Sequence, residues 1–265
     1  VEAKLKDPCS TMSVEPLTEE RIETDSTYDA GTTTQLMWGA RSDVGCVRPH
    51  NEDSYLVQSP LFCVCDGMGG HAAGEVASSI AVETIAKTAP QSADAARLAA
   101  AVEAANAAVI EAALNGLGKP GMGCTATCAY IENDTLAIAH VGDSRAYLLH
   151  EGTLIRVTRD HSYVEELVDA GEITADEARV HPNRSVITRA LGSDPAMYAD
   201  HFTLHIEEGD RLILCSDGLS SMIPDSDIEN IATQSSTAQI CVDNLVDAAL
   251  AAGGHDNVTV VVVDL

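Results

Sequence analysis

The chain contains 265 residues, of which 45% are apolar, so it can bury a sizeable core as one large domain or two small ones. Its 15 basic and 41 acidic residues give a formal net charge of −26. A surface this negative repels nucleic acids and anionic lipids over a Debye length of about 8–10 Å, so we expect neither as a partner. No window approaches the ~18 uninterrupted apolar residues of a membrane span, so we expect no membrane segment.

The cysteines and the first residues bear on the cellular compartment. Eight cysteines are too few for a disulfide framework in a chain of this length. Six of them lie in apolar segments, where cysteine behaves as a small buried hydrophobe: Cys63, Cys65, Cys124, Cys128, Cys215 and Cys241. The first residues lack the apolar run of a secretory signal. We therefore expect a protein of the reducing cytoplasm, and we expect it to be a monomer.

The N-terminal segment differs in composition from the remainder. Residues 1–34 are rich in Thr, Ser, Glu and Asp and show neither a helical nor a strand period. Such a composition cannot bury enough apolar surface to offset the entropy of the chain. We therefore predict a flexible tail or linker over residues 1–34 and a single domain over residues 35–265.

Within this domain, short apolar runs that are bounded by turn residues predict β-strands. They cover residues 36–40, 55–57, 61–65, 124–131, 135–141, 146–149, 153–157, 201–206, 211–216 and 258–264. Helices are predicted over residues 75–89 and 93–115, and two more over residues 225–251 with a break around Ser235-Ser236. Residues 160–192 have few strand signals and contain a polar, helix-prone stretch, so we predict an insertion beside the sheets.

The connections between the strands indicate how they pair. Tight turns at 132–134, 151–152 and 208–210 favour antiparallel neighbours. The helices do not alternate strictly with the strands, as they would in a parallel sheet. The predicted fold class is therefore α+β, a four-layer α-β-β-α sandwich of two antiparallel sheets with helices outside, plus the insertion.

Aspartates stand at the ends of four strongly apolar strands, each within two residues of a glycine: Asp66, Asp143, Asp217 and Asp256. One Asp-Gly pair is an ordinary turn, but four carboxylates at one rim of a buried sheet cannot all stay ionised without a cation. Oxygen ligands select a hard ion such as Mg²⁺ or Mn²⁺. Glycine beside a ligand also lets a backbone carbonyl approach the ion. The pattern predicts a site for divalent cations.

A second polar cluster, RPHNED at 48–53, stands just before a predicted strand. Arg48 is one of few cations in an acidic chain, and its fork matches two oxygens of a phosphate dianion. Glu52 and Asp53 could hold waters on a metal ion. The alternative is a solvated turn with a weak Arg–Glu pair.

Together these fragments resemble the PPM-type, metal-dependent protein Ser/Thr phosphatases (the protein phosphatase 2C family) in their bacterial form. The resemblance runs in order through nearly all of residues 36–265, and the order of so many fragments makes it specific. The matching fragments are SDVGCVRPHNED (42–53), DGMGGHAAGEVAS (66–78), GMGCTAT (121–127), HVGDSRAYLL (140–149), TRDHSYVEELVDAGEIT (158–174), VITRALG (186–192), LCSDGL (214–219) and GGHDNVTVVVVD (253–264).

The resemblance implies a central β-sandwich flanked by helices, with a mobile flap at residues 160–192. It implies that Asp66 bridges two Mn²⁺ or Mg²⁺ ions and that Gly67 offers its carbonyl to one of them. Asp217 and Asp256 would complete the first metal site.

Further roles also follow only from the resemblance. In bacterial members a third, weaker ion involves the residues that match Asp143 and Asp217. Arg48 would bind the substrate phosphate. Glu52 and Asp53 would act through metal-bound water.

One position departs from the DGHGG pattern of eukaryotic members, because Met68 stands where they carry a proposed general acid. A thioether cannot donate the proton that expulsion of a serine alkoxide requires. The alternative proton donors are a metal-bound water near Asp143, the side chain of His71 and the side chain of His181.

The leading hypothesis is metal-dependent hydrolysis of phosphoserine and phosphothreonine in proteins, in which a hydroxide that bridges two ions attacks the phosphorus in line. Such an enzyme would reverse Ser/Thr kinase signalling, so its expected partners are phosphorylated proteins, namely a Ser/Thr kinase and its targets. The alternatives are a catalytically silent, phosphoprotein-binding pseudophosphatase and a hydrolase of small phosphate esters.

Overall fold

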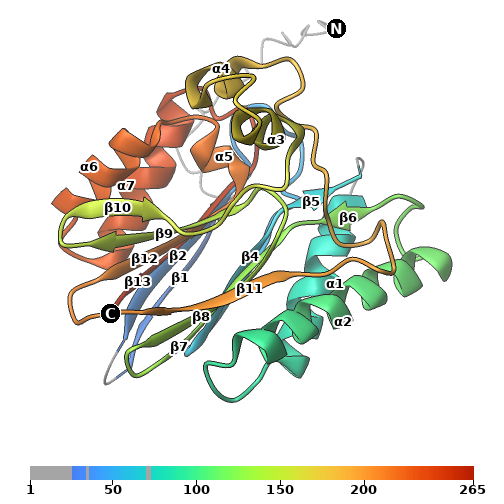
Figure 1. Cartoon of the computed structure of the whole chain (residues 1–265), viewed down its shortest axis with the longest axis horizontal. Coiled ribbons are helices and arrows are strands. Elements are labelled where there is room, and N and C mark those ends of the chain that lie inside the picture. Colours follow the sequence, from blue (N-terminus) through green and yellow to red (C-terminus); the bar gives the residue numbers. More distant parts are fainter. Residues whose placement is uncertain (1–25, 34–35, 70–72) are drawn as a thin grey trace, which may run out of the picture.

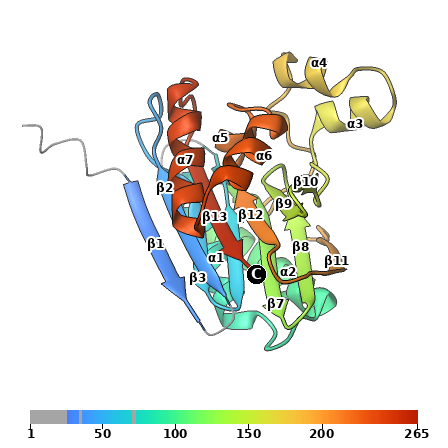
Figure 2. The same cartoon turned by 90° about the vertical axis from the view of Figure 1, so that its left-hand side faces the viewer.

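The computed structural model describes residues 26–33, 36–69 and 73–265. Two antiparallel sheets lie face to face (Figure 1, Figure 2). In spatial order, the first sheet contains β1 (Ser26–Thr32), β2 (Met37–Asp43), β13 (Val258–Asp264), β12 (Arg211–Cys215), β9 (Arg145–His150) and β10 (Thr153–Arg156). The second contains β11 (Asp200–His205), β8 (Thr135–Val141), β7 (Ala126–Glu132), β4 (Leu61–Cys65) and β3 (Ser54–Gln58).

Helices cover the outer face of each sheet (Figure 2). The first sheet is covered by α6 (Asp225–Gln234) and α7 (Ala238–Ala251). The second is covered by α1 (Ala73–Thr88) and α2 (Ala95–Leu114). The predicted α+β fold, a four-layer sandwich of two antiparallel sheets, is confirmed.

Burial of both faces of each sheet explains the continuous apolar runs. In β4, Phe62 and Val64 belong to the core between the sheets. The alternate residues Leu61, Cys63 and Cys65 pack with α1 and α2. Since successive side chains of a strand point to opposite faces, a strand between two apolar layers must be apolar at every position.

Local signals fixed two hairpins and one helix break. Asn133 and Glu151 have positive φ angles of 54° and 48°, and they stand in two-residue turns that join β7 to β8 and β9 to β10. The predicted break is confirmed, because α6 ends at Gln234 and α7 begins at Ala238. Thr237 caps α7 by accepting a hydrogen bond from the N–H of Ile240.

The prediction of a tail over residues 1–34 is wrong for residues 26–32, which form β1. This edge strand pairs antiparallel with β2, and most of its side chains are exposed. Backbone hydrogen bonds hold such a strand, so its composition carries no apolar signal. Residues 1–25 lie outside the described residues.

Short elements were also missed: β5 (Gly67–Met68), β6 (Gly123–Cys124) and α5 (Asp217–Ser220). The first two pair with each other as a separate small sheet. Elements of two to four residues span only about one repeat of the hydrophobic period of a strand or helix, so periodicity cannot reveal them.

The insertion at 160–192 contains α3 (Tyr163–Asp169) and α4 (Ala175–Val180), which protrude at one end of the sandwich (Figure 2). Its two stems meet where Ser162 bridges Ile187 and where the N–H of Thr188 donates to the carbonyl of His161 at 2.9 Å. We call residues 163–186, which lie beyond this junction, the flap.

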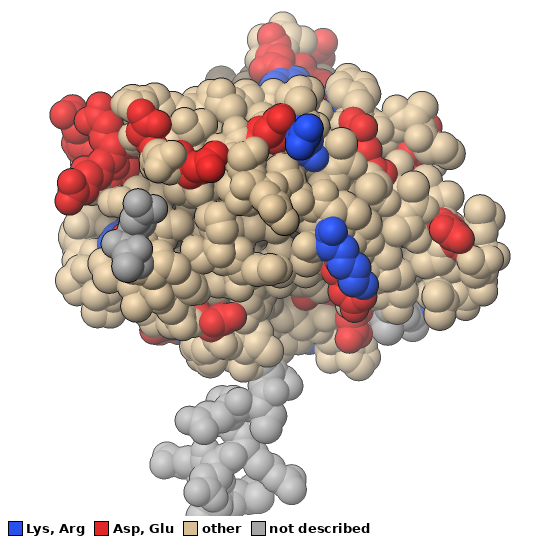
Figure 3. Space-filling model, turned by 90° about the horizontal axis from the view of Figure 1, so that it is seen from below, with Lys and Arg blue, Asp and Glu red and all other residues tan. Residues whose placement is uncertain are grey.

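The surface and the cysteines agree with the composition. Acidic side chains are spread over the face seen in Figure 3, where basic side chains appear at few places. The six cysteines of the apolar segments are buried and free, whereas Cys46 is exposed. None of the helices in the described ranges is long and apolar enough to cross a membrane.

Phe62→Ala should lower the free energy of unfolding by about 3–5 kcal/mol, the usual cost of a cavity where a buried aromatic ring is removed. Phe62 is fully buried between the sheets, and its ring meets that of Trp38 edge to face with centroids 5.9 Å apart. Urea denaturation measures the change, with Ile240→Ala on the exposed side of α7 as control. A loss below about 1 kcal/mol, the range of an average substitution, would contradict this packing.

Candidate active site

One edge of the sandwich collects the predicted carboxylates. β4, β8 and β12 end at this edge, and β3 and β13 begin there because they run antiparallel to β4 and β12. Asp66, Asp143 and Asp217 follow the strands that end, and Asp53 and Asp256 precede the strands that begin. The antiparallel topology therefore brings together residues that are far apart in the sequence.

The carboxylates at this edge raise one another's pKa values. Burial raises the pKa of Asp66 well above its usual range, and the charges of Asp53, Asp217, Asp143 and Asp256 raise it further. Burial and the charge of Asp256 raise the pKa of Asp217 to about 6. The pKa of Asp143 is also raised, first by burial and then by Asp217. A set of carboxylates that all favour protonation is a set that favours a cation.

Asp53 is a buried carboxylate of the cluster. One carboxylate oxygen accepts hydrogen bonds from Ser216 Oγ at 2.8 Å and Thr259 Oγ1 at 2.7 Å. Even so, burial raises its pKa to about 7. The Oδ1 atoms of Asp53, Asp143 and Asp217 are buried without a hydrogen-bond partner among the described residues. Unpaired buried carboxylate oxygens fit a hard divalent cation, which supplies the missing charge.

The carboxylates of the cluster do not converge on one point where an ion would bind. In the described part of the chain, no group of three or more His, Cys, Asp or Glu side chains is arranged to hold an ion as it stands. Asp256 forms an ion pair with Arg48, whose Nη2 lies 2.7 Å from Asp256 Oδ2. This hydrogen bond, with the charge of Asp256, raises the pKa of the Arg48 guanidinium. A cation bound by Asp256 would compete with Arg48 for this carboxylate.

Glycine permits the close packing of the loops at this edge. A Cβ at Gly67 would lie 2.3 Å from the carbonyl oxygen of Gly74 and 2.4 Å from that of Glu52. A Cβ at Gly218 would lie 1.9 Å from the carbonyl oxygen of Asn257. The backbones beside Asp66 and Asp217 therefore approach their neighbours more closely than any side chain allows.

Asn257 is a structural residue of the site that our sequence analysis missed. Its side chain donates to the carbonyls of Val44 and His50, each at 2.9 Å, and accepts from the N–H of Glu52 at 2.8 Å. It thereby fastens the loop that carries Arg48 and Glu52 to the start of β13. Its place next to Asp256 was the available signal.

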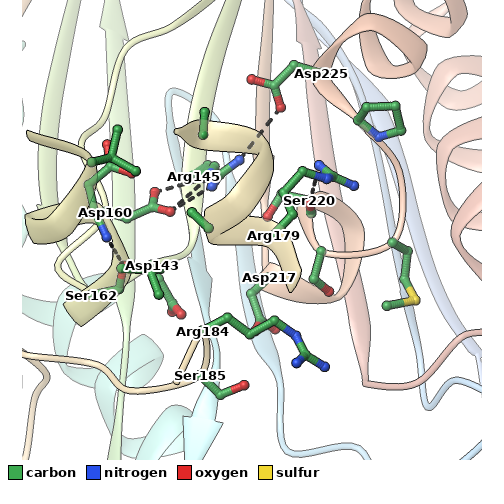
Figure 4. Close-up of a pocket in the computed structure, with 18 of the residues that line it drawn as sticks. Asp143, Arg145, Asp160, Ser162, Arg179, Arg184, Ser185, Asp217, Ser220 and Asp225 are labelled. Atoms are coloured by element: carbon green, nitrogen blue, oxygen red, sulfur yellow. Dashed lines mark hydrogen bonds and ion pairs between the residues drawn. The ribbon is translucent and has the colours of Figure 1, made fainter. Parts of the chain in front are cut away.

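A pocket of about 430 Å³ lies between the flap and the segment that contains α5 and the start of α6 (Figure 4). Asp143, Asp217 and Asp256 line one part of it. Arg145 lines another part, where it pairs with Asp160 at 2.7 Å and lies 3.6 Å from Asp225. The pocket thus leads from the carboxylates to the flap.

The remaining candidates are placed as follows. The backbone of Glu52 is fixed beside Gly67, while its side chain adds to the negative field around Arg48. His181 follows α4, accepts a hydrogen bond from the N–H of Asn183 at 3.1 Å and does not line the pocket. His71 lies outside the described residues.

Known proteins are similar to this chain over most of its length. Residues 38–258 match the family described as Protein phosphatase 2C. The chain is 43% identical over 242 residues to the serine/threonine protein phosphatase PstP of Mycobacterium tuberculosis. The match covers 89% of this chain and 46% of the relative. This chain therefore spans about half the length of that relative. It is also 37% identical over 236 residues to the serine/threonine phosphatase stp of Listeria welshimeri, with 84% of this chain and 94% of the relative covered.

Solved structures agree. The crystal structure of the M. tuberculosis phosphatase PstP/Ppp has a TM-score of 0.82 at 42% identity and covers 87% of this chain and 98% of that one. The PstP catalytic domain in complex with two manganese ions has a TM-score of 0.80 at 40% identity, covering 86% and 97% of the two chains. The order of the fragments, the paired sheets and the family match lead to one conclusion: the chain belongs to the protein phosphatase 2C family.

Proposed function

We propose that this chain hydrolyses phosphoserine and phosphothreonine in proteins with Mn²⁺ or Mg²⁺ bound in the carboxylate cluster. The observation that carries the proposal is the set of coupled carboxylates with unpaired buried oxygens beside an arginine. A relative at 40% identity, the PstP catalytic domain, is described in complex with two manganese ions, which supports the proposed metal.

The aspartates and the carbonyl of Gly67 would bind the metal ions. Asp66, Asp217 and Asp256 would hold two ions with the carbonyl of Gly67, and Asp143 would hold a third, weaker one. Such ions polarise phosphoryl oxygens and lower the pKa of water that they hold.

Arg48 has the geometry for a phosphate clamp. It is half-exposed at the mouth of the cluster, and its fork can leave Asp256 to donate to two phosphate oxygens. Glu52 and Asp53 would orient water next to the ions. Ser216 is fully buried, and its hydroxyl donates to Asp53 and accepts from the N–H of Thr259, so we do not expect it to reach a substrate or to form a phosphoenzyme.

The cellular setting is part of the proposal. The substrates would come from a Ser/Thr kinase and its targets. The buried free thiols of the described residues suit a reducing compartment, and we propose the cytoplasm. We also propose a monomer, since the carboxylates and Arg48 all come from one chain.

With Mn²⁺, the protein should release phosphate from a phosphothreonine peptide, and chelation should abolish turnover. Asp66→Asn and Asp217→Asn should each lower kcat by about 10²–10³-fold, as expected when one electrostatic stabiliser of a transition state is lost. Asp227→Asn, on the exposed face of α6, is the matched control.

Three other outcomes of this assay would overturn the proposal. Turnover that survives chelation would exclude a metal mechanism. Peptide binding without turnover in any divalent cation would favour a pseudophosphatase. A much higher kcat/KM for p-nitrophenyl phosphate than for phosphopeptides would favour a hydrolase of small esters.

Arg48→Ala should raise the KM for a phosphopeptide and, in the absence of substrate, tighten Mn²⁺ binding. Both effects follow from the same contact, because Arg48 neutralises Asp256 and is the cation nearest the cluster. Steady-state kinetics and isothermal titration calorimetry measure the two effects, with Arg97→Ala on α2 as control. Arg48→Lys should restore only part of the KM, since an ammonium lacks the fork. An unchanged KM would contradict the clamp.

The metal-free protein should lose stability as the pH rises. The folded-state pKa values of Asp53, about 7, and Asp217, about 6, lie above the value of ~3.9 for an unfolded chain. The folded state therefore holds more protons than the unfolded state between about pH 4 and pH 7, and its unfolding free energy falls through this window. The stabilisation is fully present below the unfolded pKa and is lost above the folded pKa.

Thermal denaturation at several pH values measures this loss, and saturating Mn²⁺ should flatten the profile because the ions replace the protons. Asp53→Asn should reduce the slope of the metal-free profile, while Asp227→Asn should leave it unchanged. The same slope with and without Mn²⁺ would contradict the prediction.

A further inference from the structure

His161 joins the base of the flap to the turn that carries Asp143. The N–H of Gly142 donates to His161 Nδ1 at 3.0 Å, and the N–H of His161 donates to the carbonyl of Gly142 at 2.7 Å. Gly142 is therefore held by both the ring and the backbone of one residue. The next residue in the chain is Asp143.

The Gly142 turn packs closely against Thr125. Its φ angle is +108°, and a Cβ there would lie 2.5 Å from Cγ2 of Thr125. The carboxyl of Asp143 that follows is buried, and its Oδ1 has no partner among the described residues. The direction of this carboxyl thus depends on the turn and not on hydrogen bonds to its Oδ1.

The hydrogen bonds fix the tautomer of His161. Because Nδ1 accepts from Gly142, the ring proton is on Nε2, which donates to Asp200 Oδ2 at 2.9 Å. Arg189 binds the other oxygen of Asp200 at 2.6 Å and lies 3.2 Å from Nε2. Burial, with this arginine nearby, lowers the pKa of His161. The ring is neutral, accepts on one side and donates on the other.

The same residue belongs to the stem of the flap. The carbonyl of His161 accepts from the N–H of Thr188, and Ser162 bridges Ile187. Asp200 begins β11, so the donor side of the ring is attached to the edge strand of the second sheet. His161 therefore contacts both flap stems, a sheet strand and the Asp143 turn.

We propose that His161 is a positioning residue that couples the flap to Asp143: its Nδ1 holds the Gly142 turn, and its Nε2 anchors the flap stem to Asp200. The inference rests on the proposed function, in which Asp143 is a metal ligand. His161 would not touch substrate, since it acts through Gly142 and Asp200.

Two substitutions distinguish the roles of Nδ1 and Nε2 of His161. In His161→Asn the amide oxygen can replace Nδ1, but nothing reaches Asp200. In His161→Gln the longer amide can reach Asp200, but no acceptor faces Gly142. Asp200→Asn keeps the ring and weakens its anchor, together with the ion pair between Asp200 and Arg189. His205→Asn, at an exposed histidine of β11, is the control.

Two measurements that need no turnover provide the answer. Mn²⁺ titration by calorimetry reports the carboxylate side, and limited trypsin cleavage after Arg184, which is exposed in the flap, reports the stem. His161→Gln should weaken the weakest Mn²⁺ binding step by about 10–100-fold, the usual effect of losing a residue that orients a ligand. His161→Asn and Asp200→Asn should leave that step within about threefold of wild type and speed cleavage several-fold.

Equal effects of His161→Asn and His161→Gln on both measurements would overturn the proposal, and so would two variants that match wild type. If His161→Gln fails to fold by circular dichroism, Asp200→Asn decides, because fast cleavage with unchanged Mn²⁺ binding is expected only if the two sides are separate. Failure of the proposed function would appear differently, as a wild-type protein that does not turn over phosphopeptide with Mn²⁺ although the two measurements still separate the variants.

Discussion

Repulsion between carboxylates is the constraint on which the site depends. Antiparallel pairing brings aspartates from both sheets to one edge, and burial removes the water that would otherwise screen their charges. The chain compensates in part, since Arg48 pairs with Asp256, and Ser216 and Thr259 donate to Asp53. Three buried carboxylate oxygens are still left without a donor among the described residues. A hard cation supplies what these contacts do not, and a net charge of −26 makes that cation the natural source of positive potential for a phosphate group.

The fold could be predicted to the extent that burial leaves a mark on the sequence. β4 and β13 are apolar at nearly every position because helices cover one face and the other sheet covers the second. The turns at Asn133 and Glu151 were visible because two-residue hairpins require particular backbone angles. β1 left no such mark, since an exposed edge strand is held by its backbone. α5 is a single turn that begins at Asp217, and its sequence is indistinguishable from a loop.

The sequence pattern could predict the aspartates of the candidate site, but not the residues that hold them in place. Asp66, Asp143 and Asp217 stand where apolar strands end, and this pattern can be recognised in a linear sequence. The roles of Asn257 and His161 depend on which distant backbone groups meet them. Three of the hydrogen bonds of Asn257 span more than 200 residues of sequence. The pairing of Arg48 with Asp256 is also invisible in the sequence, because the two residues stand 208 positions apart.

The position of His161 has a consequence for motion. A flap that moved independently of the carboxylates would need a hinge away from them, but here the junction of its stems is hydrogen-bonded to Gly142. Movement of the stem must therefore either break these bonds or carry the Asp143 turn with it. A movement that opens or closes the pocket would then also change the arrangement of its carboxylates. A neutral imidazole suits this junction because its two nitrogens accept and donate in opposite directions, which neither lysine nor arginine can do.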